Sequence, residues 1–147
     1  MFKKNEGFTL IEILIAVAIV GILASIAYSN YSQQVLKSSR SDAKVALNET
    51  AQRLQRCFTS NFTYKPAAGL CKVADDVASS GVQSVEGFYL IKASSIAYTS
   101  TTYTLEAKAI AGKRQEKDVK CEVVSLDQTG KKTAKDSGGN DTSKECW

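Results

Sequence analysis

The chain has 147 residues, of which 44% are hydrophobic and 23% charged, and its formal net charge is +4. This length allows one compact domain plus a membrane anchor, and so small a charge excess is not typical of a dedicated nucleic-acid binder. Because the chain has no histidine and no Ser/His/Asp, Cys/His or phosphate-loop motif, we expect neither an enzyme nor a cofactor.

The chain opens with a short basic stretch followed by a long apolar run. Two lysines precede residues 8–27, in which Thr9, Glu12 and Ser25 are the only interruptions. About 20 apolar residues suffice to cross a bilayer, and the preceding lysines favour a cytoplasmic N-terminus. A carboxylate at the centre of a membrane helix costs about 2.5–3.5 kcal/mol, and less near an end. Glu12 is therefore a candidate functional residue.

The spacing of Glu12 suggests its partner. If the chain is cut after Gly7, Phe8 carries a new α-ammonium, and Phe8 and Glu12 lie four residues apart on one helix face. Within one subunit the pair is awkward, because the ammonium lies at the helix tip. Between two subunits staggered along a common axis, Glu12 of one subunit meets the Phe8 ammonium of the next. That pair would lie in an apolar core, where an unpaired charge is costly.

The segment Lys-Lys-Asn-Glu-Gly7-Phe8-Thr-Leu-Ile-Glu12, followed by an apolar helix, resembles the N-terminus of type IV pilins. The resemblance implies that a prepilin peptidase cuts between Gly7 and Phe8 and methylates the new Phe8 amine. It also implies that Glu12 supports assembly and contacts the N-terminus of a neighbouring subunit. The pilin organisation has three parts: a leader at residues 1–7, a hydrophobic membrane and assembly helix at 8–29, and a globular head at 30–147.

Two other interpretations of the N-terminus stay open. Ser25-Ile26-Ala27 is a small-x-small site of the kind that a signal peptidase cleaves, although Glu12 disrupts the apolar region of a signal peptide. The second is a plain membrane anchor in which Glu12 has no role.

After the apolar run, the pattern predicts an amphipathic helix to about Phe58. Apolar side chains recur at spacings of three and four, which marks one face of a helix. This face comprises Leu36, Ala43, Leu47, Thr50, Leu54 and Cys57. The charged residues mostly lie off it: Arg40, Lys44, Glu49, Arg53 and Arg56. This half of the helix needs a core to pack on, which the remaining residues must supply.

Residues 59–86 read as a connecting loop, because they lack periodicity and contain a proline and two glycines. Four cysteines behind an export-type N-terminus predict two disulfides in an oxidising compartment. Cys57 and Cys71 bracket the first part of the loop, so a bridge between them would fasten the loop to the helix end. In the alternative interpretation, Cys57 is simply a buried core residue.

The rest of the chain reads as antiparallel strands. Alternation from Tyr103 to Ala109 puts every second side chain on one face, and Val119, Cys121 and Val123 likewise share a face. The expected strands are 88–91, 101–110, 119–126 and, after a turn at Leu126–Gly130, an edge strand at 131–134. With the long N-terminal helix packed on this small sheet, the fold class is α+β.

The C-terminal end carries a second, weaker resemblance to type IV pilins. A cysteine on the third strand, a Leu-Asp-Gln-x-Gly turn and a final Cys146-Trp147 are the usual frame of their disulfide-bounded loop. Four cysteines allow three connectivities. We choose Cys57–Cys71, which closes a local loop, and Cys121–Cys146, which pins the polar tail 136–143 to the sheet. The acidic residues of that tail do not match a calcium loop, so we expect no metal site.

Basic side chains cluster in the C-terminal third of the chain. If the last two strands pair, some of these cations share a face and could contact DNA phosphates: Lys113, Arg114, Lys117, Lys131 and Lys132. A solvated face that protects the sheet edge is the simpler interpretation.

The resemblance implies a structural subunit of a type IV pilus. The precursor would lie in the bacterial inner membrane, with the prepilin peptidase and the pilus assembly machinery as partners. The processed chain would join other pilin subunits in an extracellular filament that serves adhesion, twitching motility or DNA uptake. Three alternatives remain: a type II secretion pseudopilin, against which the C-terminal cysteine pair argues, a DNA-binding minor pilin of competence pili, and an exported enzyme, for which a catalytic set is missing.

Overall fold

The computed structural model describes residues 8–147, so the expected leader at residues 1–7, with Gly7, lies outside the described residues. The chain divides into two compact units, one ending at Val35 and the other comprising Leu36–Trp147. The long helix α1 (Leu10–Asn61) contributes to both units.

The first unit is the apolar half of α1. Its large apolar side chains from Phe8 to Tyr31 are all mostly exposed, and even Ile13, the least exposed of these, is 51% exposed, whereas Val35 at the end of the unit is half-buried. Within residues 8–147, α1 is the one helix that is long and apolar enough to cross a membrane, judged by length and composition alone. An apolar surface of this extent requires lipid or other protein to cover it.

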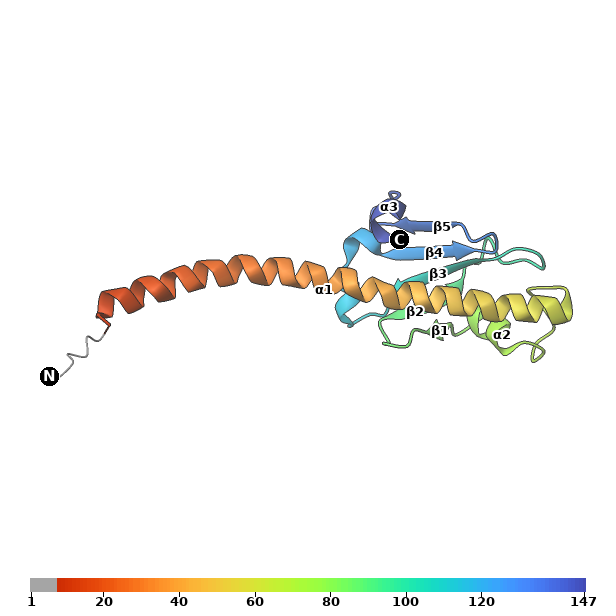
Figure 1. The fold of residues 1–147 in the computed structure, drawn as a ribbon. Helices are drawn as coiled ribbons and strands as arrows, with labels where there is room; N and C mark the ends of the chain where they lie inside the picture. The colour runs from red at the N-terminus through yellow and green to blue at the C-terminus, as the bar shows by residue number, and fades with distance from the viewer. Residues whose placement is uncertain (1–7) are drawn as a thin grey trace. The chain divides into compact units, whose positions relative to one another are not determined.

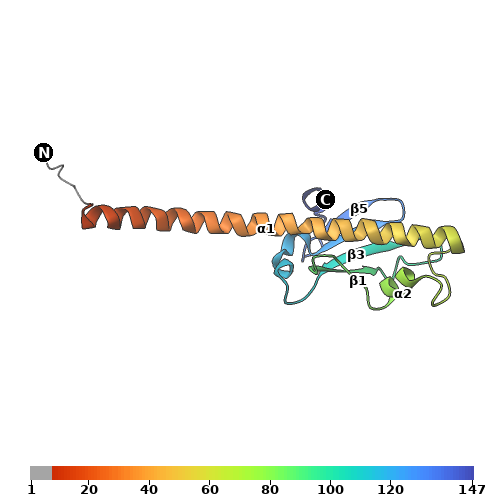
Figure 2. The ribbon, with the colours of Figure 1, turned by 60° about the horizontal axis from the view of Figure 1, so that its bottom comes forward.

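The second unit is a two-layer α+β head, in which residues 36–61 of α1 lie across one face of an antiparallel sheet (Figures 1 and 2). The strands pair in chain order, and β5 forms an edge as expected for residues 131–134. They are β1 (Val82–Gln83), β2 (Tyr89–Ala93), β3 (Thr104–Ala109), β4 (Val123–Asp127) and β5 (Lys132–Lys135). The predicted fold class is confirmed.

The core forms where the apolar face of α1 meets the sheet. Leu47 and Leu54 of α1 are fully buried, which confirms the face predicted from spacings of three and four. The strand register aligns Ile91, Ala107 and Val124 in one row across β2, β3 and β4, and all three are fully buried. Burial of each leucine contributes about 1.5–3 kcal/mol relative to exposure.

One charged residue of α1 was misplaced by the sequence analysis. Arg40, expected off the apolar face, is only 6% exposed. Its Nε and Nη2 donate to the two carboxylate oxygens of Asp118 at 2.6 and 2.9 Å, and Nη1 donates to the Glu145 carbonyl at 3.2 Å. Burial, together with the nearby Asp118 charge, raises the pKa of Tyr89 beside this pair.

The prediction of a loop over residues 59–86 was wrong in part. The segment contains α2 (Lys72–Ala78) as well as β1. Helix α2 buries Val73, Ala74 and Val77 against the core. A helix of seven residues is too short to be stable alone or to show a clear periodicity, so tertiary packing decides its existence.

The third predicted strand begins later than expected. Residues Val119–Cys121 form a short 3₁₀ helix, η2, which follows another, η1 (Arg114–Lys117). Cys121 N donates to the Asp118 carbonyl at 3.1 Å, so the chain turns here before β4 begins. The prediction that Val119, Cys121 and Val123 share one strand face was therefore also wrong. Val124 is fully buried, whereas Val119 is 59% exposed.

Both expected disulfides are present. Cys57–Cys71 joins α1 to the residue before α2, with the two Cα atoms 6.1 Å apart. Cys121–Cys146 joins η2 to the final helix α3 (Ser143–Cys146), at 5.8 Å. The second bridge encloses β4, β5 and the polar tail, and so ties the chain end to the sheet.

The polar tail is a structured turn around Asp136. Its Oδ1 accepts hydrogen bonds from the backbone N–H groups of Gly138 and Asn140, each at 2.9 Å. Hydrogen bonds from the side chain and backbone of Asn140 are the main cause that lowers the pKa of Asp136. The carboxylate oxygens of Asp136 thus stabilise the turn by accepting hydrogen bonds from residues within it.

Candidate functional site

Phe8 and Glu12 flank the start of α1, where the predicted processing and assembly residues lie. The Phe8 side chain is 83% exposed and immediately precedes Thr9 and the helix. Thr9 donates to Glu12 Oε2 from its backbone N at 2.9 Å and from its hydroxyl at 2.7 Å, and Glu12 N donates back to Thr9 Oγ1 at 3.4 Å. This reciprocal arrangement is a capping box.

The capping box gives Glu12 a role within its own subunit that the sequence analysis missed. A Thr-x-x-Glu pattern before an apolar run is its sequence signal, and it was readable in Thr9–Glu12. The carboxylate satisfies the free Thr9 N–H and lies favourably at the positive end of the helix dipole. Contact with a neighbouring Phe8 amine stays a prediction. Within residues 8–147 the hydrogen bonds to the Glu12 carboxylate all fall on Oε2, which leaves Oε1 for such a contact.

The five cations proposed for DNA fall into two groups at opposite ends of β4. Lys113, Arg114 and Lys117 precede β4, whereas Lys131 and Lys132 follow it in the β4–β5 turn and at the start of β5. All five are exposed. The Arg114 guanidinium lies 4.7 Å from the Phe88 ring centroid, and the Lys132 ammonium lies 5.0 Å from the Trp147 ring centroid.

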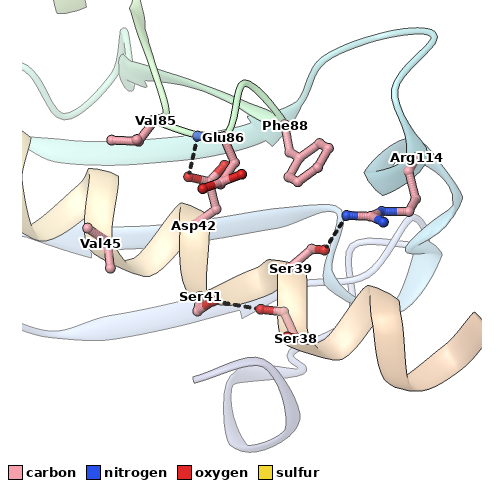
Figure 3. Close-up of a pocket in the computed structure, with 9 residues that line it drawn as sticks. All are labelled: Ser38, Ser39, Ser41, Asp42, Val45, Val85, Glu86, Phe88 and Arg114. Carbon is pink, nitrogen blue, oxygen red and sulfur yellow. Dashed lines mark hydrogen bonds between the residues drawn. The ribbon is translucent and has the colours of Figure 1, made fainter. Parts of the chain in front are cut away.

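A cleft of about 460 Å³ lies beside the first group, between α1 and the turn that joins β1 to β2 (Figure 3). Arg114 donates to Ser39 Oγ at 3.0 Å on one side of it. On the other side Asp42 accepts hydrogen bonds from Glu86 N and the Ser84 hydroxyl. The Ser41 hydroxyl donates to the Ser38 carbonyl and not to a base, so Ser41 is not an activated nucleophile.

A second hollow, of about 570 Å³, lies between the end of α1 and α2. Arg53 and Arg56 of α1 line it together with Lys72 of α2. From the sequence, both arginines were expected to lie off the apolar face of the helix. Only the tertiary structure brings Lys72 beside them.

A family model described as "Type IV minor pilin ComP, DNA uptake sequence receptor" matches residues 29–125, which is 97 of the 147 residues. The chain belongs to this family of minor pilins. A second model, the prokaryotic N-terminal methylation motif, matches residues 2–28 of the minor pilin. That match spans both sides of the Gly7–Phe8 bond and includes Glu12.

Similarity to individual proteins is strongest in short segments. The minor pilin is 50% identical to the type IV major pilin protein PilA of Myxococcus xanthus over 52 residues, 34% of this chain and 24% of PilA. It is 39% identical to a "Probable minor fimbrial protein" of Dichelobacter nodosus over 61 residues, 42% of this chain and 38% of that protein. It is 36% identical to the type IV major pilin protein PilE1 of Neisseria gonorrhoeae over 88 residues, 58% of this chain and 41% of PilE1.

The matched segments thus span about a quarter to two fifths of the length of these relatives. By name these relatives are pilins and fimbrial proteins, which are structural proteins and not enzymes.

Proposed function

We propose that the minor pilin is a structural subunit of a type IV pilus. The observation that carries this proposal is the exposed apolar half of α1, which starts directly after the Gly7-Phe8 motif. A precursor with this helix is held in the bacterial inner membrane, where a prepilin peptidase cleaves between Gly7 and Phe8 and methylates Phe8. The assembly machinery then moves the helix from lipid into the filament.

Assembly replaces lipid around α1 with the apolar helices of other pilin subunits. This exchange keeps side chains such as Leu10, Ile13 and Val17 away from water. Oε1 of Glu12 then receives the Phe8 ammonium of the adjoining subunit, so that neither charge is left unpaired in an apolar core. The head, with its own buried core, stays in water outside the helical bundle.

The test is to locate the chain and its N-terminus. Sheared surface filaments and cell membranes are separated, and the peptides of this chain are analysed by mass spectrometry. We expect the filament fraction to contain a peptide that starts at Phe8 and is one methyl group heavier than unmodified. A mature chain that starts at Tyr28 supports a signal peptide instead, and processed protein confined to the envelope supports a secretion pseudopilin.

We propose DNA binding as a second function, because the family model is described as a DNA uptake sequence receptor. The lysines and arginines exposed on the head are compatible with contacts to phosphates. The test is fluorescence anisotropy of a labelled DNA duplex with the full chain in detergent micelles, over a series of salt concentrations. We expect an affinity that falls steeply as salt rises, and absence of binding at low salt contradicts this function.

A further inference from the structure

Three cationic side chains converge on the groove between α1 and α2. Arg53 and Arg56 project from successive turns of α1, and Lys72 projects from the first residue of α2. Asp76 is the one acidic residue among the side chains that line the groove. By contrast, the cleft in Figure 3 has a single cation, Arg114, against the carboxylates of Asp42 and Glu86.

The Cys57–Cys71 disulfide links the two segments that carry these cations. Arg56 directly precedes Cys57 and Lys72 directly follows Cys71. The bridge holds the Cα atoms of the two cysteines 6.1 Å apart and itself lines the groove. Lys72 is thereby fixed beside α1 in a covalently closed loop, which makes the cluster a built feature of the head.

The cations of the groove are available to a ligand. Arg53 pairs with Glu49 on the exposed surface of α1. Lys72 pairs with Asp76, and the Lys72 side chain is 88% exposed. Exposed pairs four residues apart on a helix contribute less than about 0.5 kcal/mol, so a bound anion displaces them readily. Within residues 8–147, no side-chain partner of the Arg56 guanidinium is seen.

We propose that this groove binds phosphate groups of a nucleic-acid backbone and is the main DNA contact of the head. The proposal rests on the second proposed function. Arginine presents a planar fork that binds two phosphate oxygens at once, and two such forks with a lysine fit a run of backbone phosphates. Arg114, in the group that precedes β4, is instead held by Ser39 and Phe88.

The experiment compares two triple variants that remove the same charge. The groove variant is Arg53→Gln/Arg56→Gln/Lys72→Gln, and the control is Lys113→Gln/Arg114→Gln/Lys117→Gln. Binding of a labelled duplex to the full chain in detergent is measured between about 50 and 200 mM salt. The groove variant should weaken binding at least about tenfold and lower the magnitude of the logarithmic salt slope by about 2 to 3, and the control should change both far less.

A single variant guards against misfolding. Arg56→Gln alone removes an exposed side chain, and it should lower the magnitude of the salt slope by about 1. Intact disulfides, confirmed by non-reducing mass spectrometry, and an unchanged far-UV circular dichroism spectrum verify the fold of all variants. If the wild type binds DNA and the groove variant matches it or loses no more than the control, the groove assignment is overturned and the DNA-binding function stands. If the wild type binds no DNA, both are overturned.

Discussion

Substitutions can separate the capping role of Glu12 from its proposed role in assembly. Glu12→Gln preserves the capping box, because glutamine serves equally well at this position, but it removes the charge. We expect cleavage after Gly7 and membrane insertion to proceed normally. Incorporation into filaments should fall, because removing one partner of a buried ion pair typically destabilises the assembly by about 3–5 kcal/mol. The measurement is the ratio of filament-incorporated to membrane-held chain, by immunoblot of this chain itself.

Thr9→Val is the matched control for Glu12→Gln. It removes the hydroxyl of the capping box and leaves the carboxylate, so it should weaken the helix start by about 1 kcal/mol and leave incorporation unchanged. If Thr9→Val blocks incorporation and Glu12→Gln does not, Glu12 acts through helix capping and not through its charge.

The Arg40–Asp118 pair makes a second prediction at the residue scale. Asp118→Ala leaves the Arg40 guanidinium, 6% exposed, without its counter-charge, and should lower the free energy of unfolding by about 3–5 kcal/mol. Arg40→Met/Asp118→Leu removes both charges and should recover most of this loss. Urea unfolding of the full chain in detergent measures both variants. Equal losses for the single and the double variant are incompatible with a penalty from an unpaired charge.

At the scale of elements, the Cys121–Cys146 bridge holds β5 and α3 against the rest of the head. Its 25-residue separation corresponds to a stabilisation of about 3 kcal/mol in the chain-entropy model. Cys121→Ser/Cys146→Ser should therefore lower the free energy of unfolding by about 3 kcal/mol. Amide hydrogen exchange should rise first in β5, the edge strand. The matched control is Cys57→Ser/Cys71→Ser, which should raise exchange in α2 instead. Equal exchange in β5 for the two variants contradicts this local assignment.

At the scale of the whole molecule, the two compact units need different environments. The apolar unit needs lipid or protein around it, whereas the head is stable in water. The head draws its core from Leu36 onward, whereas the apolar half of α1 stays exposed. We expect a chain that starts at Asn30 to be soluble and to form both disulfides. Its unfolding temperature should equal that of the full chain in detergent, because no core residue is removed. Aggregation or a much lower unfolding temperature, measured by circular dichroism, contradicts an independently folding head.

Local patterns in the sequence determined the long elements and the pilin-like N-terminal motif. The spacing of Leu47 and Leu54 located the buried face of α1, and alternation from Tyr103 to Ala109 located the buried face of β3, because each element is long enough to repeat its period. The Gly7-Phe8 motif and the nearby apolar run pointed to a pilin before any fold was known. The capping box at Thr9 was equally readable.

Tertiary structure alone decided the features that join distant parts of the chain. Arg40 is buried because Asp118, 78 residues away in sequence, supplies its counter-charge, and no helical period encodes that pairing. Helix α2 exists because the core accepts Val77 and its neighbours, whereas seven residues carry too little periodicity to predict a helix. The groove of Arg53, Arg56 and Lys72 likewise joins two segments through a disulfide and the packing of α2, so the sequence contains these charges but does not show that they lie together.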